Sequence, residues 1–407
     1  MQYFQTIDVN QAVERMLDRA NEQPLRIEEV ELSSSYGRLL AKNIAADTVL
    51  PAFRRSTMDG YAVRASDCMG ASASVPAMLR LAGEVPMGEP ALIPVQKGQA
   101  VYVPTGAMIP EGADAVVMVE ETKTLGDLCL VYRSPAAGEH IVFPGEDVEK
   151  GEILLKKGTR IGPETAGMLA ALSVFSVPVF AEPKVAILST GNEIIGQDEA
   201  LTPGKVRDIN TYTIEAQMHA LGCRIVSKQR MKDDKEALIR AVREAAEQAD
   251  FVFLSGGSSV GARDYTKDAI TALSGELLFH GLNIKPGKPT LAGFANGCWI
   301  LGLPGHPVSA LLVLRSVLFP YWEGRYGEKL PRVTVQARLS ENMASSPGRL
   351  TMQSVTLKKQ DDEWIATPFY GPSAFISQLV RADGVITVPR ETEGLYAGDI
   401  VEVERLI

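Results

Sequence analysis

The stretch DFVFLSGGSSVGARDYT, residues 250–266, decides the fold of the central part of the chain. It opens with a short apolar run of β-branched and aromatic residues, which is typical of a strand inside a parallel sheet. The small residues that follow leave backbone N–H groups bare, and bare N–H groups attract anions. An Asp beside an anion is repulsive unless a cation lies between them. The stretch therefore predicts an anion site that also holds a cation.

Apolar runs and amphipathic stretches alternate on both sides of this segment, over residues 181–326. The runs VAIL, CRIVS and WILGL have the length and composition of buried strands, and the periodicity of KEALIRAVREAAEQA (235–249) predicts an amphipathic helix. Such alternation predicts a three-layer α/β domain, with helices on both faces of a parallel sheet and ligands at the carboxyl ends of its strands.

The flanking segments of the 407-residue chain are richer in β patterns. Residues 51–145 are short apolar pieces cut by Pro- and Gly-containing turns, which predicts a small all-β module. Residues 327–407 alternate with the period of a strand and predict a C-terminal β-barrel. Residues 1–50, which start with a helix, would form a linker domain completed by 146–180. The expected fold class is therefore multidomain α/β plus β.

Composition narrows the function. The net charge is −9 and no basic tail is present, so nucleic acid is not an expected partner. The four Cys and four His residues are scattered, which favours reduced thiols in a cytoplasmic protein over a disulfide framework or a zinc cluster. The start of the chain has no signal-peptide pattern. The most apolar segment, PVSALLVLRSVLFPYW, is too short and too interrupted to span a membrane and predicts a buried helix.

Two further segments follow predicted strands and point to the same sheet edge. STGNE (189–193) supplies a hydroxyl pair and a carboxylate. LPGHP (303–307) combines Pro-Gly, which predicts a type II turn, with Pro307 at the first position of a helix. Either segment alone could be an ordinary turn, but together with 255–264 they favour an anion site at this edge.

The segment KPGK, residues 285–288, predicts a second anion-binding element. Pro and Gly at its centre indicate a type II turn, which holds the Cα atoms of Lys285 and Lys288 within about 7 Å of each other. Two like charges kept this close repel each other, and a multiply charged anion is the simplest reason to keep them. The alternative, a solvated surface turn, is disfavoured by the apolar residues on both sides.

Several carboxylates could be either structural or functional. Asp59 could belong to an Asp-Gly turn, Asp147 to another turn, and the pair at 233–234 could cap the next helix. However, Mg²⁺ is usually held by one or two carboxylates together with the phosphates of a substrate. The carboxylates that could hold it here are Glu193, Asp233 and Asp264.

Seven sequence blocks between residues 56 and 310 are recognisable when taken in chain order. They are STMDGYAVR, VPTGAMIPEGADAVV, PGEDVEKG, LSTGNEI, SGGSSVGARDYT, IKPGKP and GLPGHPVSA. In this order they resemble the signature blocks of the molybdopterin molybdenumtransferase family, to which the E domain of gephyrin is akin.

The resemblance implies a homodimeric enzyme with four-domain subunits that inserts molybdenum into the molybdenum cofactor. Its substrates would be adenylylated molybdopterin and molybdate. A divalent cation, Mg²⁺, would assist cleavage of the pyrophosphate link, and AMP would be released. The molybdopterin adenylyltransferase that supplies the substrate is a candidate partner.

The resemblance also assigns roles to individual residues. The expected catalytic residues are Asp59, Thr105, Asp147, Glu193 and Asp233, of which the first three would face the α/β cleft of the partner subunit. The expected substrate-binding residues are Ser189, Thr190, Gly256, Gly257, Ser258, Gly261, Lys285, Lys288, Pro304, His306, Pro307, Arg349 and Ser373. The expected metal ligands are Glu193, Asp233 and Asp264.

Two other functions are compatible with parts of this sequence. A nucleotide pyrophosphatase or an adenylyltransferase could use the same α/β domain, but such relatives lack the module that carries MDGYA and PTGA. A non-catalytic carrier or scaffold for molybdopterin would have no use for so many carboxylates, because binding an anion gains nothing from them. The transferase is therefore the favoured function.

Overall fold

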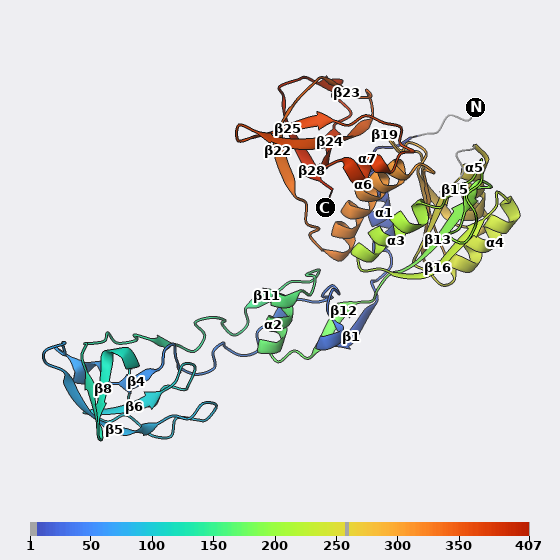
Figure 1. Cartoon of the computed structure of the whole chain (residues 1–407). Coiled ribbons are helices and arrows are strands. Elements are labelled where there is room, and N and C mark those ends of the chain that lie inside the picture. Colours follow the sequence, from blue (N-terminus) through green and yellow to red (C-terminus); the bar gives the residue numbers. More distant parts are fainter. Residues whose placement is uncertain (1–5, 257–259, 407) are drawn as a thin grey trace. The chain divides into compact units, whose positions relative to one another are not determined.

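The structure is a computed structural model that describes residues 6–256 and 260–406, with the backbone alone at 260–264. The chain forms two compact units (Figure 1). The larger unit comprises Met1–Lys42, Lys157–Ala166 and Phe175–Ile407. The smaller unit comprises Asn43–Lys156 and Gly167–Val174, and α2 (Pro163–Ala171) begins in the one and ends in the other. The division into four domains stays a prediction.

A six-stranded sheet in the order β16-β13-β17-β21-β20-β18 is the centre of the larger unit. Its strands are β13 (Lys184–Thr190), β16 (Arg224–Met231), β17 (Phe251–Gly256), β18 (Glu276–His280), β20 (Leu291–Ala295) and β21 (Cys298–Leu303). β16, β13, β17 and β21 are parallel, whereas β20 and β18 are antiparallel to their neighbours. The four parallel strands therefore end at one common edge.

Helices cover both faces of this sheet, which confirms the predicted three-layer α/β fold (Figure 1). α1 (Val9–Asn21), α3 (Asn210–Ala220) and α6 (Pro307–Tyr326) pack on one face, and α4 (Lys235–Ala246) and α5 (Val260–Ala272) pack on the other. Successive side chains of β13 point to opposite faces of the sheet. Val185 and Ile187 belong to the core on the side of α1, α3 and α6, and Ala186 and Leu188 belong to the core on the side of α4 and α5.

Local signals place most helix ends where they were predicted. Asp234 caps α4 by accepting a hydrogen bond from the backbone N–H of Ala237 at 2.8 Å, and Pro307 is the first residue of α6. Two predictions need correction. α5 begins at Val260, so the predicted loop 255–264 is shorter than expected. Gly305 does not adopt the positive φ that a type II turn requires, because the chain passes directly into α6.

A closed β-barrel forms the C-terminal part of the larger unit, as predicted. Its strands are β22 (Thr334–Leu339), β24 (Leu350–Gln360), β25 (Glu363–Pro368), β26 (Gly384–Val388) and β28 (Ile400–Arg405), and the pairing of β24 with β26 closes it. The short strand β19 (Ile284–Lys285) extends this sheet beside β24. The remaining short elements of the unit are η1 (Leu32–Ser34), β14 (Ile194–Ile195), β15 (Val206–Arg207), β23 (Met343–Ala344), α7 (Ser377–Arg381) and β27 (Gly394–Leu395).

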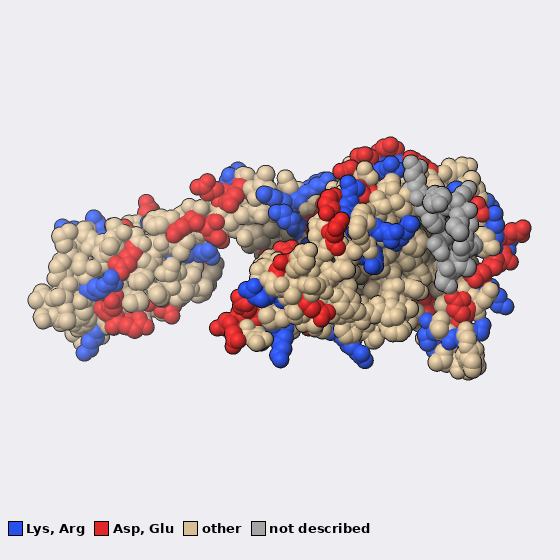
Figure 2. All heavy atoms as spheres, turned by 90° about the horizontal axis from the view of Figure 1, so that it is seen from above, with Lys and Arg blue, Asp and Glu red and all other residues tan. Residues whose placement is uncertain are grey.

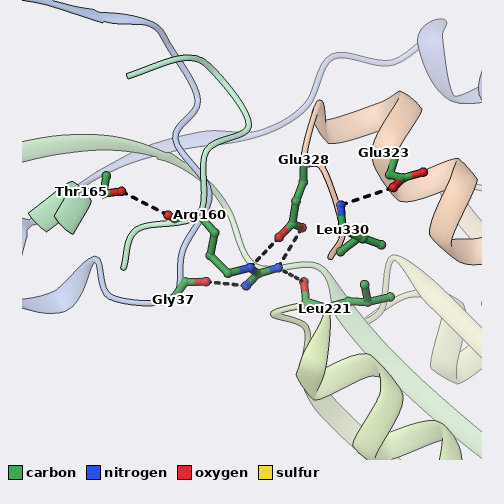
Figure 3. Close-up of polar contacts among 7 residues, drawn as sticks. All are labelled: Gly37, Arg160, Thr165, Leu221, Glu323, Glu328 and Leu330. Carbon is green, nitrogen blue, oxygen red and sulfur yellow. Dashed lines mark hydrogen bonds and ion pairs between the residues drawn. The ribbon is translucent and has the colours of Figure 1, made fainter. Parts of the chain in front are cut away.

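An arginine network joins several segments of the larger unit near the antiparallel pair β1 (Ile27–Glu31) and β12 (Ser176–Phe180) (Figure 3). The Arg160 guanidinium donates from Nε and Nη2 to the Glu328 carboxylate at 2.6 and 2.9 Å. It also donates to the backbone carbonyls of Gly37 at 2.6 Å and Leu221 at 3.3 Å. Glu328 is buried, so this ion pair is shielded from water.

The smaller unit is built from strands, as predicted for residues 51–145. Its six-stranded sheet, ordered β7-β4-β6-β5-β9-β8, comprises β4 (Gly60–Val63), β5 (Ala77–Glu84), β6 (Gln99–Val103), β7 (Ala115–Met118), β8 (Thr122–Leu125) and β9 (Leu128–Val131). The other elements are β2 (Ile44–Ala45), β3 (Arg55–Ser56), η2 (Ala65–Cys68), η3 (Val119–Glu121), β10 (Ile141–Val142) and β11 (Ile153–Leu155). Apolar side chains fill both faces of the sheet.

The side-chain chemistry agrees with the composition. All four Cys residues are free and buried, and burial raises the pKa of the Cys68 thiol to about 11 and that of Cys129 to about 12. Figure 2 shows acidic and basic side chains interspersed over the visible face of each unit. In the part of the chain that the structure describes, no helix is long and apolar enough to cross a membrane.

Candidate functional site

The carboxyl ends of the parallel strands bring the predicted polar segments together. Thr190 at the end of β13 pairs with Met231 of β16 on one side and with Gly256 of β17 on the other. Ser255 pairs with Leu303, where β21 ends before the segment that leads into α6. The segments that carry STGNE, the Asp pair at 233–234, SGG and LPGHP therefore leave the sheet at the same edge.

Gly256 is required by the close packing of this edge. Its φ is +134°, and a Cβ atom at this position would lie 1.8 Å from the carbonyl oxygen of Thr190. By contrast, a Cβ atom on Gly305 would have its nearest contact at 3.7 Å, with the Gly256 carbonyl carbon. The first glycine is therefore fixed by sterics, whereas the second has room for a methyl group.

We expect Gly256→Ala to lower the free energy of unfolding of the larger unit by about 1–3 kcal/mol, because the methyl group forces the backbone of β17 away from β13. Gly305→Ala is the matched control and should change it by much less. Urea unfolding followed by tryptophan fluorescence measures both variants, since Trp299, Trp322 and Trp364 are the only Trp residues of the sequence and all lie in this unit. Equal losses in the two variants would contradict the steric argument.

Two carboxylates at this edge are available to a ligand. Glu193 follows β13 and Asp233 follows β16, and neither forms an ion pair with another described residue. The helix cap is Asp234, so the structural role that the sequence left open for Asp233 is taken by its neighbour. Within the described ranges, no three His, Cys, Asp or Glu side chains gather into a metal site. A Mg²⁺ ion here would therefore need ligands from its substrate, which is its usual mode of binding.

Basic residues of separate segments lie where the α/β part joins the barrel. Lys285 directly follows Ile284, and Arg349 directly precedes Leu350, the residue that pairs with Ile284 across β19 and β24. Lys288 lies in the turn that directly follows Lys285. A hydrogen bond from the Leu282 N–H to the Lys288 carbonyl at 2.9 Å holds the backbone of this turn. Lys285, Lys288 and Arg349 are called the basic cluster below. None of the three forms an ion pair with a described residue.

In the turn that carries the two lysines, Gly287 has a positive φ of 118°, the sign that a type II turn requires at this position, and the Lys285–Pro286 peptide bond is cis. Gly287 also packs against α6, since a Cβ atom there would lie 2.2 Å from Cγ2 of Val313. Both lysine side chains are nonetheless exposed, as an anion-binding role requires.

A hydrogen bond between His306 and Ser373 also links the α/β part to the barrel. His306 Nδ1 and Ser373 Oγ are 2.8 Å apart, and the Val308 N–H donates to the Ser373 carbonyl at 3.2 Å. His306 directly precedes α6, so Ser373 of the barrel lies at the start of that helix. The structure thus brings together two predicted substrate-binding residues that are far apart in the sequence.

Asp8 anchors the strand that carries Lys285. Its carboxylate accepts a hydrogen bond from Asn283 Nδ2 at 3.0 Å and pairs with Arg390 of the barrel. The hydrogen bond from Asn283, together with the bond and charge of Arg390, holds the pKa of the Asp8 carboxyl below its ordinary value of 3.8. Asp8 therefore connects α1, β19 and the barrel beside the basic cluster.

The lowered pKa of Asp8 predicts a pH dependence of stability. A carboxyl whose pKa is lower in the folded state contributes stability above its unfolded pKa and loses that contribution as the pH falls through the folded pKa. We therefore expect the wild type to unfold at a higher urea concentration than Asp8→Asn at pH 7. This difference in urea midpoint should shrink as the pH falls below about 3.8. Asp18→Asn, an exposed change on the same helix, should show no such difference. A difference in urea midpoint that does not change with pH would refute the contribution of the ionised Asp8 carboxyl to stability.

The smaller unit holds a separate polar pair. Asp59 Oδ1 accepts hydrogen bonds from the backbone N–H of Thr105 at 2.6 Å and from its hydroxyl at 2.9 Å. The backbone hydrogen bond, followed by that of the hydroxyl, lowers the pKa of the Asp59 carboxyl. Asp147 is exposed, and its N–H donates to the Leu50 carbonyl at 3.0 Å. The structure joins Asp59 to Thr105 but records no bond from the Asp147 side chain to either.

Some predicted residues lie outside this description. Gly257 and Ser258 fall outside the described residues, and of Gly261 and Asp264 the structure describes only the backbone, as part of α5. One residue was missed by the sequence reasoning: Asn210, whose buried amide donates hydrogen bonds to Ser255 and Gly305 at the strand edge. Its only signal was a polar side chain at the start of a helix.

The fold is that of a multidomain α/β protein whose predicted polar segments meet at one sheet edge. Family models agree along most of the chain: the MoeA N-terminal region (domain I and II) matches residues 7–173, a probable molybdopterin binding domain matches 186–324, and the MoeA C-terminal region (domain IV) matches 336–406.

Curated relatives and solved structures extend these matches. Molybdopterin molybdenumtransferase from Haemophilus influenzae is 32% identical over 98% of both chains, and that from Bacillus subtilis is 32% identical over 92% of this chain and 88% of the relative. A molybdopterin biosynthesis MoeA protein from Pyrococcus horikoshii OT3 superposes with a TM-score of 0.83 at 30% identity, covering 98% of this chain and all of that one. The chain belongs to the molybdopterin molybdenumtransferase family and is a transferase enzyme of molybdenum cofactor biosynthesis.

Proposed function

We propose that the enzyme transfers molybdenum from molybdate into adenylylated molybdopterin, cleaving the pyrophosphate link and releasing AMP. The observation that carries this proposal is the pairing of β19 with β24, which sets Lys285 beside the Arg349 segment of the barrel. Three cations at one junction, none paired with a described residue, suit a substrate with several negative groups, such as a pyrophosphate. The family membership of the chain supports the same substrate class.

The residues of the larger unit have distinct roles in this proposal. The lysines and Arg349 bind phosphate oxygens. Glu193 and Asp233 would hold Mg²⁺, with Asp264 as a third predicted ligand, and the bound ion would neutralise charge on the pyrophosphate. Ser189, Thr190, Pro304 and Pro307 shape the edge where these groups meet.

The Asp59–Thr105 pair is proposed as a second catalytic element, together with Asp147. Because two hydrogen bonds stabilise its carboxylate form, Asp59 remains negatively charged and can orient a hydroxyl, an ammonium group or a hydrated cation. We also propose that the active form is a cytoplasmic homodimer, and that it receives its substrate from the adenylyltransferase. Analytical ultracentrifugation of the full chain tests whether the protein is a homodimer.

Purified enzyme supplied with adenylylated molybdopterin, molybdate and Mg²⁺ tests the proposal. AMP release is followed by chromatography, and the molybdenum-containing product is detected by its ability to activate a cofactor-free molybdoenzyme. We expect both signals from the wild type and a loss of both in Glu193→Gln. Glu247→Gln, an exposed change at the far end of α4, is the matched control and should behave as the wild type.

The outcomes separate this function from its rivals. AMP release without active cofactor would indicate a pyrophosphatase. Tight binding of the pterin with no AMP release, in the wild type as in Glu193→Gln, would indicate a carrier. Either result would refute the proposed transfer.

A further inference from the structure

Asn210 connects the two backbone segments that flank the strand edge. It is the first residue of α3 and is 7% exposed. Its Nδ2 group donates to the Ser255 hydroxyl at 2.6 Å and to the Gly305 carbonyl at 2.9 Å, with a longer contact to the Pro304 carbonyl at 3.4 Å. A single amide thus joins the end of β17 to the segment that leads into α6.

The orientation of this amide is imposed by its partners. The carbonyl oxygens of Pro304 and Gly305 can only accept hydrogen bonds, so the NH₂ group must face them. The opposite orientation would set Oδ1 against two other acceptors. In the orientation observed, Oδ1 is buried and has no hydrogen-bond partner among the described residues. Leaving a buried acceptor unpaired is costly, and such exceptions are often found where a residue serves function.

The segments that Asn210 joins are close to each other and to the expected phosphate. Gly305 packs against Gly256, with only 3.7 Å between its ideal Cβ position and the Gly256 carbonyl carbon. Gly305 lies two residues before Pro307, where α6 begins, and Ser255 directly precedes Gly256. A shift of either segment would move the start of α6 relative to the end of β17.

We infer that Asn210 is a positioning residue for the reaction: its amide sets the spacing between the carboxyl end of β17 and the start of α6, so that both segments bind one pyrophosphate group. This inference rests on the proposed function, because it takes the pyrophosphate of adenylylated molybdopterin as the bound group. Asn210 itself acts through Ser255 and Gly305 and does not need to touch the substrate.

Three substitutions weaken the hydrogen bonds of the Asn210 amide to different degrees. Ser255→Ala removes one contact of the amide, Asn210→Ala removes all of them, and Asn210→Asp replaces the donor by a carboxylate that repels both carbonyls. We expect the KM for adenylylated molybdopterin and the Kd for inorganic pyrophosphate to rise in this order, about tenfold for Asn210→Ala and about a hundredfold for Asn210→Asp.

Met218→Ala is the control that separates positioning from stability. Met218 is fully buried on the same helix, in the core between α3 and the sheet, so its truncation destabilises the unit without touching the strand edge. It should lower the melting temperature at least as much as Asn210→Ala, yet leave the KM and the pyrophosphate Kd unchanged. If Asn210→Ala lowers only the melting temperature, as this control does, the inference is overturned.

The experiment distinguishes its own failure from that of the proposed function. Pyrophosphate binding, measured by calorimetry, does not depend on turnover. If the wild type releases no AMP but the graded loss of pyrophosphate binding is seen, the function is wrong and the positioning role stands. If Asn210→Asp does not fold, Ser255→Ala and Asn210→Ala carry the test. A wild type that neither binds pyrophosphate nor releases AMP contradicts both.

Discussion

Arg160→Ala is expected to lower the free energy of unfolding of the larger unit by about 3 kcal/mol. The substitution leaves the Glu328 carboxylate buried without its cation, and it removes the hydrogen bonds to the Gly37 and Leu221 carbonyls (Figure 3). The side chain of Glu328 is 6% exposed and that of Arg160 31%, so water can replace the lost partner only in part. Urea unfolding followed by tryptophan fluorescence measures the change.

The neighbouring pair of Arg332 and Glu323 provides a matched control. Their side chains are 40% and 31% exposed and 2.8 Å apart, so Arg332→Ala should cost less than about 1 kcal/mol. Glu328→Gln tests the same network from the other side, and it should cost less than Arg160→Ala because the charge left without a partner, on Arg160, is 31% exposed and can be hydrated. Equal effects of Arg160→Ala and Arg332→Ala would show that burial does not strengthen this pair.

Lys285→Ala and Arg349→Ala are each expected to raise the KM for adenylylated molybdopterin about ten- to a hundredfold, because each removes a charge-assisted hydrogen bond to phosphate. The two residues come from the α/β part and from the barrel, and both lack an ion-pair partner among the described residues. Raising the ionic strength should weaken binding in the wild type more than in either variant, since one charge fewer remains to be screened.

Lys359→Ala is the matched control for these variants. Lys359 is on β24, the strand that Arg349 directly precedes, and its side chain is 55% exposed and is paired with Asp362 at 2.9 Å. Its removal should leave the KM unchanged. A normal KM for Lys285→Ala combined with a lowered melting temperature would support the alternative in which the KPGK turn is only structural.

The sequence by itself determined the class of the fold and the order of its parts. Periods of two and of 3.6 residues predicted the strands and helices, and local signals such as Asp234 and Pro307 placed helix starts, because capping and φ restriction act within a few residues. The same local reasoning went wrong at Pro304–Gly305, where Gly305 lacks the positive φ of a type II turn because the chain passes directly into α6.

Only the tertiary structure decided which residues meet. His306 bonds Ser373, Asp8 bonds Asn283 and Arg390, and Asn210 joins β17 to the start of α6, over separations that no local pattern encodes. The physical reason is that strand order and barrel closure bring these positions together through long-range backbone pairing, whereas composition and periodicity report only the neighbourhood of each residue.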